Sequence, residues 1–109
     1  MARFVDAIDL PVGPEQAFDY LADFHRTAEW DPGVVRGEKL DPGPPRRGSR
    51  FRVVTGLLGR ETPLEYEIEA FERPHRLVLR GGDDTLTSLD EIHFVPRGAG
   101  TRVLYEARL

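Results

Sequence analysis

Cysteine is absent from the sequence, so the chain has no disulfide framework, no thiol nucleophile and no thiolate metal site. No hydrophobic run is long enough to span a membrane, and residues 1–10 lack the pattern of a signal peptide. The net charge of −4 argues against nucleic acid or an anionic membrane as a partner, since both require a positive field. These absences favour a soluble protein of a reducing compartment, and we expect it to be cytoplasmic, without stable membrane insertion.

Residues that carry hydrolytic or metal chemistry are also scarce. The motifs G-x-S-x-G and H-E-x-x-H do not occur, which gives a hydrolase triad or a metalloprotease site little support. Gly98-Ala99-Gly100 joins two expected strands instead of opening a helix, so we interpret it as a hairpin and not as a nucleotide-binding loop. The few histidines lie far apart in the sequence, at His25, His75 and His93. We therefore expect no metal site and no cofactor.

Helical spacing occurs in residues 14–32. Four apolar residues recur there at helical offsets, namely Ala17, Phe18, Leu21 and Phe24. Pro14 suits the first position of a helix, and Pro32 disfavours helical geometry in the residue before it. Spacing alone leaves open whether Asp23 breaks this region or only bends it. We expect two short helices, with Trp30 closing the second.

The rest of the sequence has the alternation that is typical of strands. Residues 3–10 alternate, but their apolar residues fall on both parities, so the inward face of this strand stays open. Residues 34–40 follow as an extended segment, and from Gly48 onward the period is two. Short segments with glycine or proline separate the alternating runs, as in hairpins. The sequence thus predicts a single α+β domain, residues 1–109, with a curved antiparallel sheet of about six or seven strands.

One face of this sheet carries charges of both signs. Glutamates alternate with apolar residues in 64–70, and the strands expected beside them carry arginines. We expect cross-strand ion pairs instead of catalytic carboxylates among Glu65, Glu67, Glu69, Arg50, Arg52, Arg76 and Arg80.

The opposite face of the sheet is apolar and lacks a sufficient cover. After Pro32 no amphipathic helical segment follows, and one short helical region cannot cover a sheet of this size. Three covers are open: a C-terminal segment missing from this sequence, a second protomer, or a bound apolar ligand.

The order of a first strand, the stretch PEQAFDYLADFHRTAEWDPGV and a meander ending in FVPRGAGTRVLYEARL resembles the START-like or Bet v 1-like superfamily (SRPBCC). The resemblance is to its bacterial polyketide cyclase/dehydrase-like group in particular. The most specific pieces mark a fold and no catalytic site; they are Phe18 with Leu21-Ala22-Asp23-Phe24, Trp30-Asp31-Pro32-Gly33, Gly48-Ser49-Arg50-Phe51 and Gly100-Thr101-Arg102-Val103.

This resemblance implies a helix-grip fold, in which a curved sheet wraps around a long C-terminal helix and leaves an apolar cavity. Members bind lipids, sterols, polyketides, hormones or other hydrophobic molecules, and a few catalyse cyclisation or dehydration. The long C-terminal helix is missing from this sequence. If the sequence is a piece of a longer chain, the cavity has lost a wall; if it is natural, we expect pairing with another subunit.

The strand pattern and the resemblance together predict a set of side chains that line the concave face. We expect a ligand to contact Leu21, Trp30, Phe51, Val53, Tyr66, Ile68, Leu79, Phe94, Val103 and Tyr105. Tyr66 and Tyr105 bring hydroxyls to this apolar face, and His25 brings an imidazole, a group that commonly transfers protons, so these three are candidates for moving a proton. Each also has a structural interpretation, as a core tyrosine or a surface histidine.

Binding of a hydrophobic small molecule, lipid-like or polyketide-like, is the function that these features favour. One alternative is a cyclase or dehydratase of polyketide type that uses the cavity tyrosines or His25 for proton transfer. Another is an interaction module that forms a homodimer through the uncovered face. Leu57 and Leu58 at a hairpin tip add a candidate gate, dimer contact or membrane-touching tip.

Overall fold

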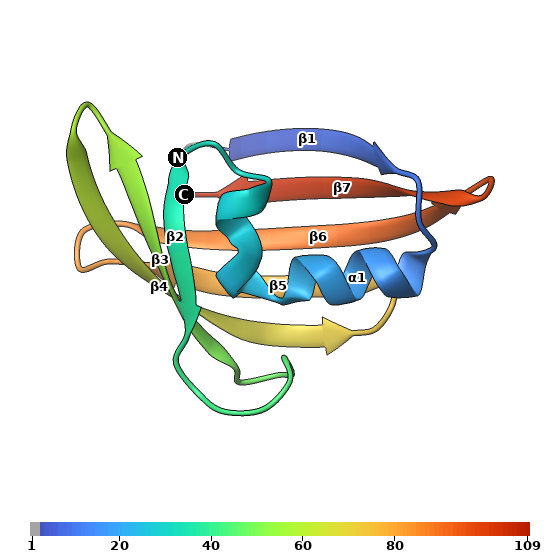
Figure 1. Ribbon diagram of the computed structural model, residues 1–109, viewed down its shortest axis with the longest axis horizontal. Helices are drawn as coiled ribbons and strands as arrows, with labels where there is room; N and C mark the ends of the chain where they lie inside the picture. Colours follow the sequence, from blue (N-terminus) through green and yellow to red (C-terminus); the bar gives the residue numbers. More distant parts are fainter. Residues whose placement is uncertain (1–2) are drawn as a thin grey trace.

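In residues 3–109, the part of the chain that the computed structural model describes, seven strands form one antiparallel sheet. The elements follow one another as β1 (Arg3–Leu10), α1 (Pro14–Ala22), the 3-10 helix η1 (Phe24–Glu29), β2 (Val34–Lys39), β3 (Arg50–Leu57), β4 (Arg60–Glu72), β5 (Arg76–Gly82), β6 (Thr87–Arg97) and β7 (Gly100–Arg108). The strand order is β1-β7-β6-β5-β4-β3-β2, so β1 and β2 form the two edges (Figure 1).

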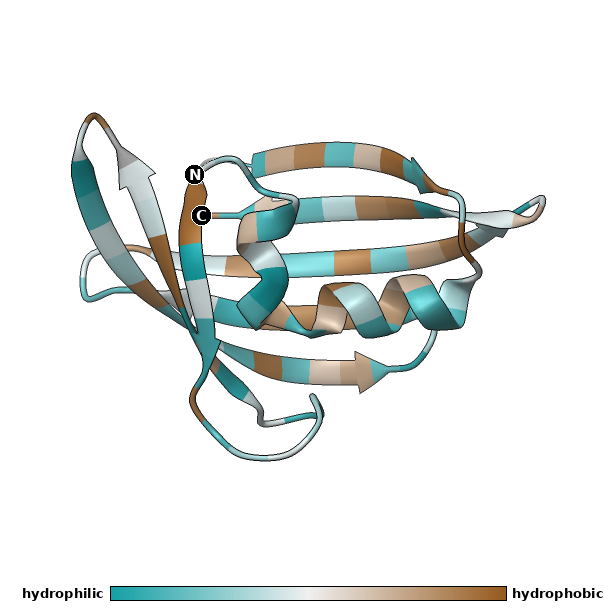
Figure 2. Cartoon of the chain, viewed as in Figure 1, coloured by the Kyte–Doolittle hydropathy of each residue, from teal (hydrophilic) through white to brown (hydrophobic). Residues whose placement is uncertain are grey.

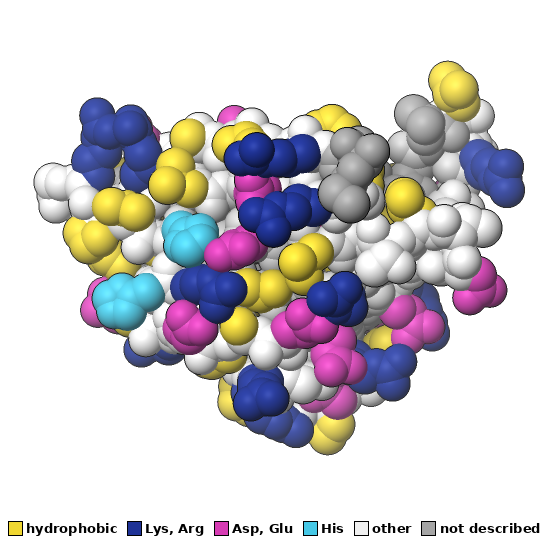
Figure 3. Space-filling view, turned by 180° about the vertical axis from the view of Figure 1, so that it is seen from behind, with side chains coloured by type: hydrophobic (Ala, Val, Ile, Leu, Met, Phe, Trp, Pro, Cys, Tyr) yellow, Lys and Arg dark blue, Asp and Glu magenta, His cyan; other side chains and the backbone are white. Residues whose placement is uncertain are grey.

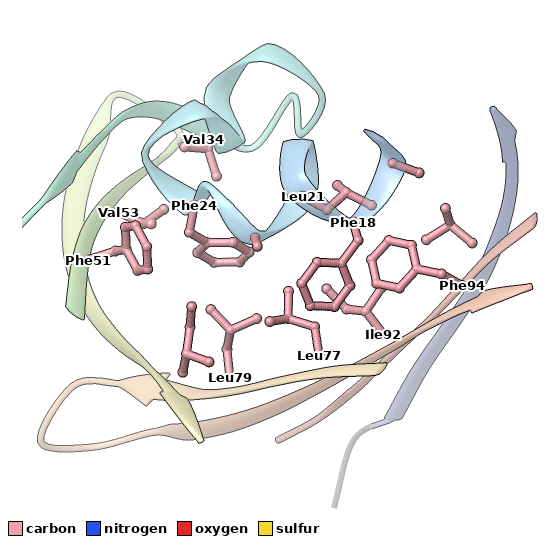
Figure 4. Close-up of a cluster of buried hydrophobic side chains, with 14 residues drawn as sticks. Phe18, Leu21, Phe24, Val34, Phe51, Val53, Leu77, Leu79, Ile92 and Phe94 are labelled. Carbon is pink, nitrogen blue, oxygen red and sulfur yellow. The ribbon is translucent and has the colours of Figure 1, made fainter. Parts of the chain in front are cut away.

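The sheet is strongly curved, and both helices lie on its concave side (Figures 1 and 4). β2 and β3 run across the direction of β5, β6 and β7 (Figure 1). The register between β4 and β5 shifts between Ile68 and Ala70, and such a bulge increases the bend of a strand. The expected α+β helix-grip architecture, with two short helices after the first strand, is confirmed. No helix follows β7 within the described residues.

The two helices follow from their sequences. α1 begins with Pro14 at its first position and Glu15 in its first turn, where proline needs no hydrogen-bond acceptor and an acid favours the helix dipole. At Asp23 the backbone leaves helical geometry, with φ −82° and ψ 76°, and η1 begins at the next residue. Trp30 caps η1. The prediction of two helices, broken at Asp23 and closed by Trp30, is therefore confirmed.

The core lies between these helices and the inner face of the sheet (Figure 4). Phe18 of α1 packs against Phe94 and Phe71, with ring centroids 5.1 and 5.0 Å apart. Phe24 of η1 lies 6.1 Å from the ring of Phe51 on β3. Hydrophobic and hydrophilic bands alternate along the strands, as a half-buried sheet requires (Figure 2). Burial of these aromatic rings holds α1 and η1 on the sheet.

Strand β1 is the part of the concave side that the helices leave uncovered. Its register on β7 pairs Phe4 with Ala107 and Ile8 with Val103, and Val103 faces the core. Directly paired residues share a face of the sheet, so Phe4 and Ile8 also face the concave side. Both are exposed, at 62% and 46%. The expectation of an incompletely covered apolar face is thus confirmed at this edge, and we call Phe4 and Ile8 the apolar strip.

The convex face carries the mixed charges that the alternation predicts (Figure 3). Arg50 pairs with Glu65 at 3.2 Å and Arg80 pairs with Glu69, both across neighbouring strands. Two other arginines pair with glutamates outside the expected set. Arg52 pairs with Glu38 on β2, and Arg76 pairs with Glu91 and Glu72. All of these pairs are exposed except Arg76–Glu91, which is partly buried, and this supports their structural interpretation.

The β3–β4 hairpin ends in the tip that the sequence marks as apolar. Leu58 is 97% exposed and has a φ of 53°, whereas the side chain of Leu57 lies outside the described residues. None of the described helices is long and apolar enough to cross a membrane.

Candidate ligand-binding site

The inner face of β6 changes from apolar to polar along the strand. Phe94 and Ile92 point into the core, and strand alternation puts Asp90 and Ser88 on the same face. Asp90 is only 4% exposed and Ser88 only 6%. An acid this deeply buried requires hydrogen-bond partners, because an unpaired charge in the interior is costly.

Asp90 has two such partners. The Ser88 hydroxyl donates to its Oδ1 at 2.6 Å, and the Tyr105 hydroxyl of β7 donates to its Oδ2. Tyr105 is paired directly with Ile92, two residues along β6 from Asp90, so its ring reaches the carboxylate on a diagonal across the strands. The three side chains form a buried network that joins β6 to β7.

Tyr66 of β4 approaches the same network over a glycine. Gly81 of β5 lies between Tyr66 and Ser88 in the register of the sheet. A Cβ atom at position 81 would lie only 2.3 Å from Cδ1 of Tyr66, so the tyrosine ring occupies the space above that glycine. The absence of a side chain at Gly81 therefore positions Tyr66 beside Ser88. We call Tyr66, Ser88, Asp90 and Tyr105 the polar cluster.

Burial dominates the electrostatics of the polar cluster. Burial raises the pKa of the Asp90 carboxyl, although the hydrogen bonds from Ser88 and Tyr105 favour its charged form. Burial also raises the pKa of Tyr66 to about 12, with a further contribution from the charge of Asp90. The pKa of Tyr105 is raised by burial first and by Asp90 second. Both tyrosines are therefore neutral hydroxyl groups near neutral pH.

Trp30 lies against the polar cluster from the helical side. Its ring centroid is 6.0 Å from that of Tyr105 and 6.2 Å from that of Phe24. The indole Nε1 is buried, and it has no hydrogen-bond partner among the described residues. A hydrogen-bond donor is thus left unused where the polar cluster meets the core.

A family model described as polyketide cyclase/dehydrase and lipid transport matches residues 1–109, the whole of the chain. The chain belongs to this polyketide cyclase/dehydrase and lipid transport family. The superfamily suggested by the sequence resemblance is confirmed by this match. No curated protein matches the sequence.

Several solved structures share the fold of this member of the polyketide cyclase/dehydrase family. TTHA0849 from Thermus thermophilus is 22% identical with a TM-score of 0.81, and the match covers 98% of this chain and 73% of that one. DR_A0006 from Deinococcus radiodurans is 21% identical with a TM-score of 0.77, covering 98% and 82%. The di-domain ARO/CYC BexL from the BE-7585A biosynthetic pathway is 20% identical with a TM-score of 0.72, covering 97% and 35%. At these identities the likeness shows the fold alone.

Most side chains predicted to line a site in this family member lie in its core. Seven are buried: Leu21, Phe51, Val53, Ile68, Leu79, Phe94 and Val103. The other three, Trp30, Tyr66 and Tyr105, are half-buried and come together at the polar cluster. His25 is not brought to the cluster, because its exposed ring pairs with Asp23 at the surface.

Ser88 and Asp90 are the residues that sequence reasoning misses. Both share the parity of Ile92 and Phe94, which the alternation places inside, so parity along β6 is the signal that identifies them.

Two surface hollows lie outside the predicted site. One, of about 410 Å³, lies on the convex side of β2, β3 and β4, where Arg36, Glu38, Arg52 and Glu61 contribute to its wall. The other, of about 330 Å³, is lined by Val5, Glu91, His93, Leu104, Tyr105, Glu106 and Arg108. Among the predicted ligand-lining residues, Tyr105 alone is part of these walls.

Proposed function

We propose that the chain binds a hydrophobic small molecule on the concave side of β7 and β1. The apolar strip carries this proposal, because Phe4 and Ile8 are exposed on the face that forms the core elsewhere in the sheet. Tyr105 is paired with Asp6, between Phe4 and Ile8, and its hydroxyl bonds to Asp90. Asp6 shares this face, so the site has apolar residues on both sides of one carboxylate along β1 and a polar end at the cluster. Apolar walls with a few polar groups are typical of sites for small molecules. Membership of a lipid transport family supports the same function.

Two exposed apolar residues of β1 on opposite faces of the sheet provide a matched test of this site. Ile8 faces the concave side, whereas its neighbour Ala7 and the exposed Val5 face the convex side. Ile8→Ser is expected to weaken binding of methyl naphthyl ketone about fivefold, since the ligand loses apolar contact area. Val5→Ser is the control and leaves the affinity unchanged. Calorimetry with both variants measures the effect.

A loss of affinity in the control variant would place the ligand on the convex side of the sheet. Val5 lines the hollow of about 330 Å³ on the convex side, so a loss of affinity in Val5→Ser alone would place the ligand there. The uncovered strip is also the surface that a second copy would cover. Sedimentation with and without the ketone shows whether ligand and dimer compete for it.

A second candidate function is proton transfer, as in a cyclase or dehydratase of polyketide type. The buried contact between Asp90 and Tyr105 favours it, since a carboxyl group with a raised pKa is a suitable base at the edge of an apolar site. In the simplest step, Asp90 takes a proton from the carbon next to a ligand carbonyl, leaving an enolate and a protonated Asp90. This carboxyl group exchanges its proton with water and then returns one to the same carbon.

Exchange of methyl protons for deuterium in methyl naphthyl ketone tests this step without knowledge of the natural substrate. NMR in heavy water should show faster exchange with the protein than with Asp90→Asn, while the affinity for the ketone stays within about twofold. Equal exchange rates would exclude Asp90 as the base and leave the binding function standing.

A further inference from the structure

The indole N–H of Trp30 is a buried donor that the described residues do not use. Buried N–H groups nearly always have an acceptor, from the protein or from a bound molecule. The Asp90 carboxylate accepts from Ser88 and Tyr105, and no described residue accepts from the Trp30 indole. Nε1 is closed to solvent in this structure, so a ligand on the concave side reaches this donor by displacing the side chains that cover it.

The position of this donor relates it to the proposed binding site. The Trp30 ring lies 6.0 Å from the Tyr105 ring, and Tyr105 is paired with the β1 residue between Phe4 and Ile8. A ligand whose apolar part contacts the apolar strip therefore lies beside Tyr105, and the Trp30 ring is next to that tyrosine. The rings of Phe24 and Tyr105 flank the indole and restrict its orientation.

Charge at this end of the site limits the chemistry of the ligand. Asp31 follows Trp30 directly, and its negative charge acts on Asp90, Tyr66 and Tyr105. Asp90 itself and Asp6, which is paired with Tyr105 on the same face of the sheet, bring two more carboxyl groups to this end of the site. A ligand carboxylate would be repelled there, whereas a neutral oxygen acceptor would not.

We propose that Trp30 determines specificity by donating its Nε1–H to a neutral carbonyl oxygen of the ligand. This inference rests on the proposed binding function and adds the chemical class of the ligand and the residue that selects it. It predicts that a neutral ketone is preferred over the hydrocarbon of the same shape and over the corresponding carboxylate.

Three probes of one shape test the inference: methyl naphthyl ketone, isopropenylnaphthalene and naphthoate. Isopropenylnaphthalene replaces the carbonyl oxygen by a methylene group and so removes only the acceptor. Calorimetry should show that the ketone binds about tenfold more tightly than the hydrocarbon, the effect of one hydrogen bond to an otherwise unsatisfied donor. Naphthoate should bind more weakly than either neutral probe.

Trp30→Phe keeps an aromatic ring and removes the donor. In this variant the ketone and the hydrocarbon should bind equally, although both bind somewhat more weakly than to the native chain. Tyr20→Phe is the matched control, because the Tyr20 hydroxyl donates to Glu29 on the exposed side of the helices. It should keep the full tenfold preference.

The single tryptophan provides a readout that does not depend on any variant. Only one indole N–H signal appears in the proton–nitrogen NMR spectrum of the chain, and it should move to lower field with the ketone and not with isopropenylnaphthalene. Equal affinities and an unmoved indole signal overturn the inference while leaving the proposed function intact. If none of the probes binds, the proposed function fails and the inference fails with it.

Discussion

The carboxylate of Asp90 on β6 accepts a hydrogen bond from the Tyr105 hydroxyl on β7 and a second one from Ser88 at 2.6 Å. This relationship between Asp90 and Tyr105 holds a buried acid at the edge of an otherwise apolar core. It also allows the stability of the fold to report on the candidate site, because loss of either partner leaves a buried polar group without its bond.

Tyr105→Phe is expected to lower the free energy of unfolding by about 1–2 kcal/mol, since Asp90 then retains only one hydroxyl donor. Urea denaturation monitored by circular dichroism measures the change. Tyr20→Phe removes an exposed hydroxyl that bonds to Glu29 at 3.0 Å, and it should cost less than about 0.5 kcal/mol. Equal effects of the two substitutions would show that the bond to Asp90 contributes little.

Asp90 should make a measurable contribution to the pH dependence of the unfolding free energy. Its pKa in the folded chain is raised above the ordinary value of 3.8, chiefly by burial, so the folded state retains this proton more readily than the unfolded state. Asp90 therefore contributes stability below about pH 3.8 that is lost as the pH rises through its folded pKa.

Asp90→Asn isolates this contribution. Carboxyl groups whose pKa is lowered, such as Asp9 beside Arg102 and Asp19 beside Arg73, are common to both proteins and cancel in the comparison. The difference in unfolding free energy, native minus Asp90→Asn, should fall as the pH increases from about 3.8. A difference that rises with pH would mean that the hydrogen bonds outweigh burial at this carboxyl.

Gly81→Ala tests how Tyr66 is positioned. The new Cβ would lie 2.3 Å from Tyr66 Cδ1 and 2.7 Å from the Glu65 carbonyl oxygen, so ring and backbone must both move. We expect a loss of about 1–3 kcal/mol in unfolding free energy. At Gly13→Ala the Cβ would meet only Glu15 Oε2, at 3.8 Å, so the cost is that of a poorer N-cap for α1, about 0.5–1 kcal/mol.

A double-mutant cycle with Tyr66→Ala identifies the cause of the Gly81→Ala effect. If the tyrosine ring is the main obstacle, Gly81→Ala costs less in the Tyr66→Ala background, and the two losses do not add. Additive losses would instead assign the cost to the Glu65 backbone.

The ion pair of Asp19 with Arg73 connects α1 to the turn between β4 and β5, with two bonds of 2.8 and 2.9 Å. Both side chains are about half exposed, so Asp19→Asn should cost no more than about 0.5 kcal/mol at low salt. The loss should disappear in concentrated salt, because screening weakens exposed pairs. An effect that persists at high salt would show that the pair acts through packing.

Much of the fold can be predicted because it depends on local periodicity. The alternation of Leu77 and Leu79 with arginines predicts a half-buried strand, and the offsets of Phe18 and Leu21 predict one buried helix face. The four apolar side chains are buried as predicted, since the period of a backbone determines which of its side chains share a face. Val78 is buried as well, so the middle of β5 is covered on both faces and not half-buried.

The candidate site can be predicted only in part. Alternation places Tyr66 and Tyr105 on the inner face. It does not indicate that a buried carboxylate, Asp90, accepts a hydrogen bond from Tyr105. Ser88 and Asp90 are polar, so hydropathy suggests an outward face, while their parity with Ile92 places them inside. His25 follows a helix near the expected cavity, yet its ring pairs with Asp23 at the surface.

By itself, therefore, the sequence determined the strands, the two short helices and the charged convex face, because each depends on neighbours within a few positions. Only the tertiary structure decided which side of β1 is concave, since its apolar residues fall on both parities and the pairing with β7 selects one. Only the tertiary structure brought Trp30, Tyr66, Asp90 and Tyr105 together, because strand register and hydrogen bonds join residues that no local pattern relates.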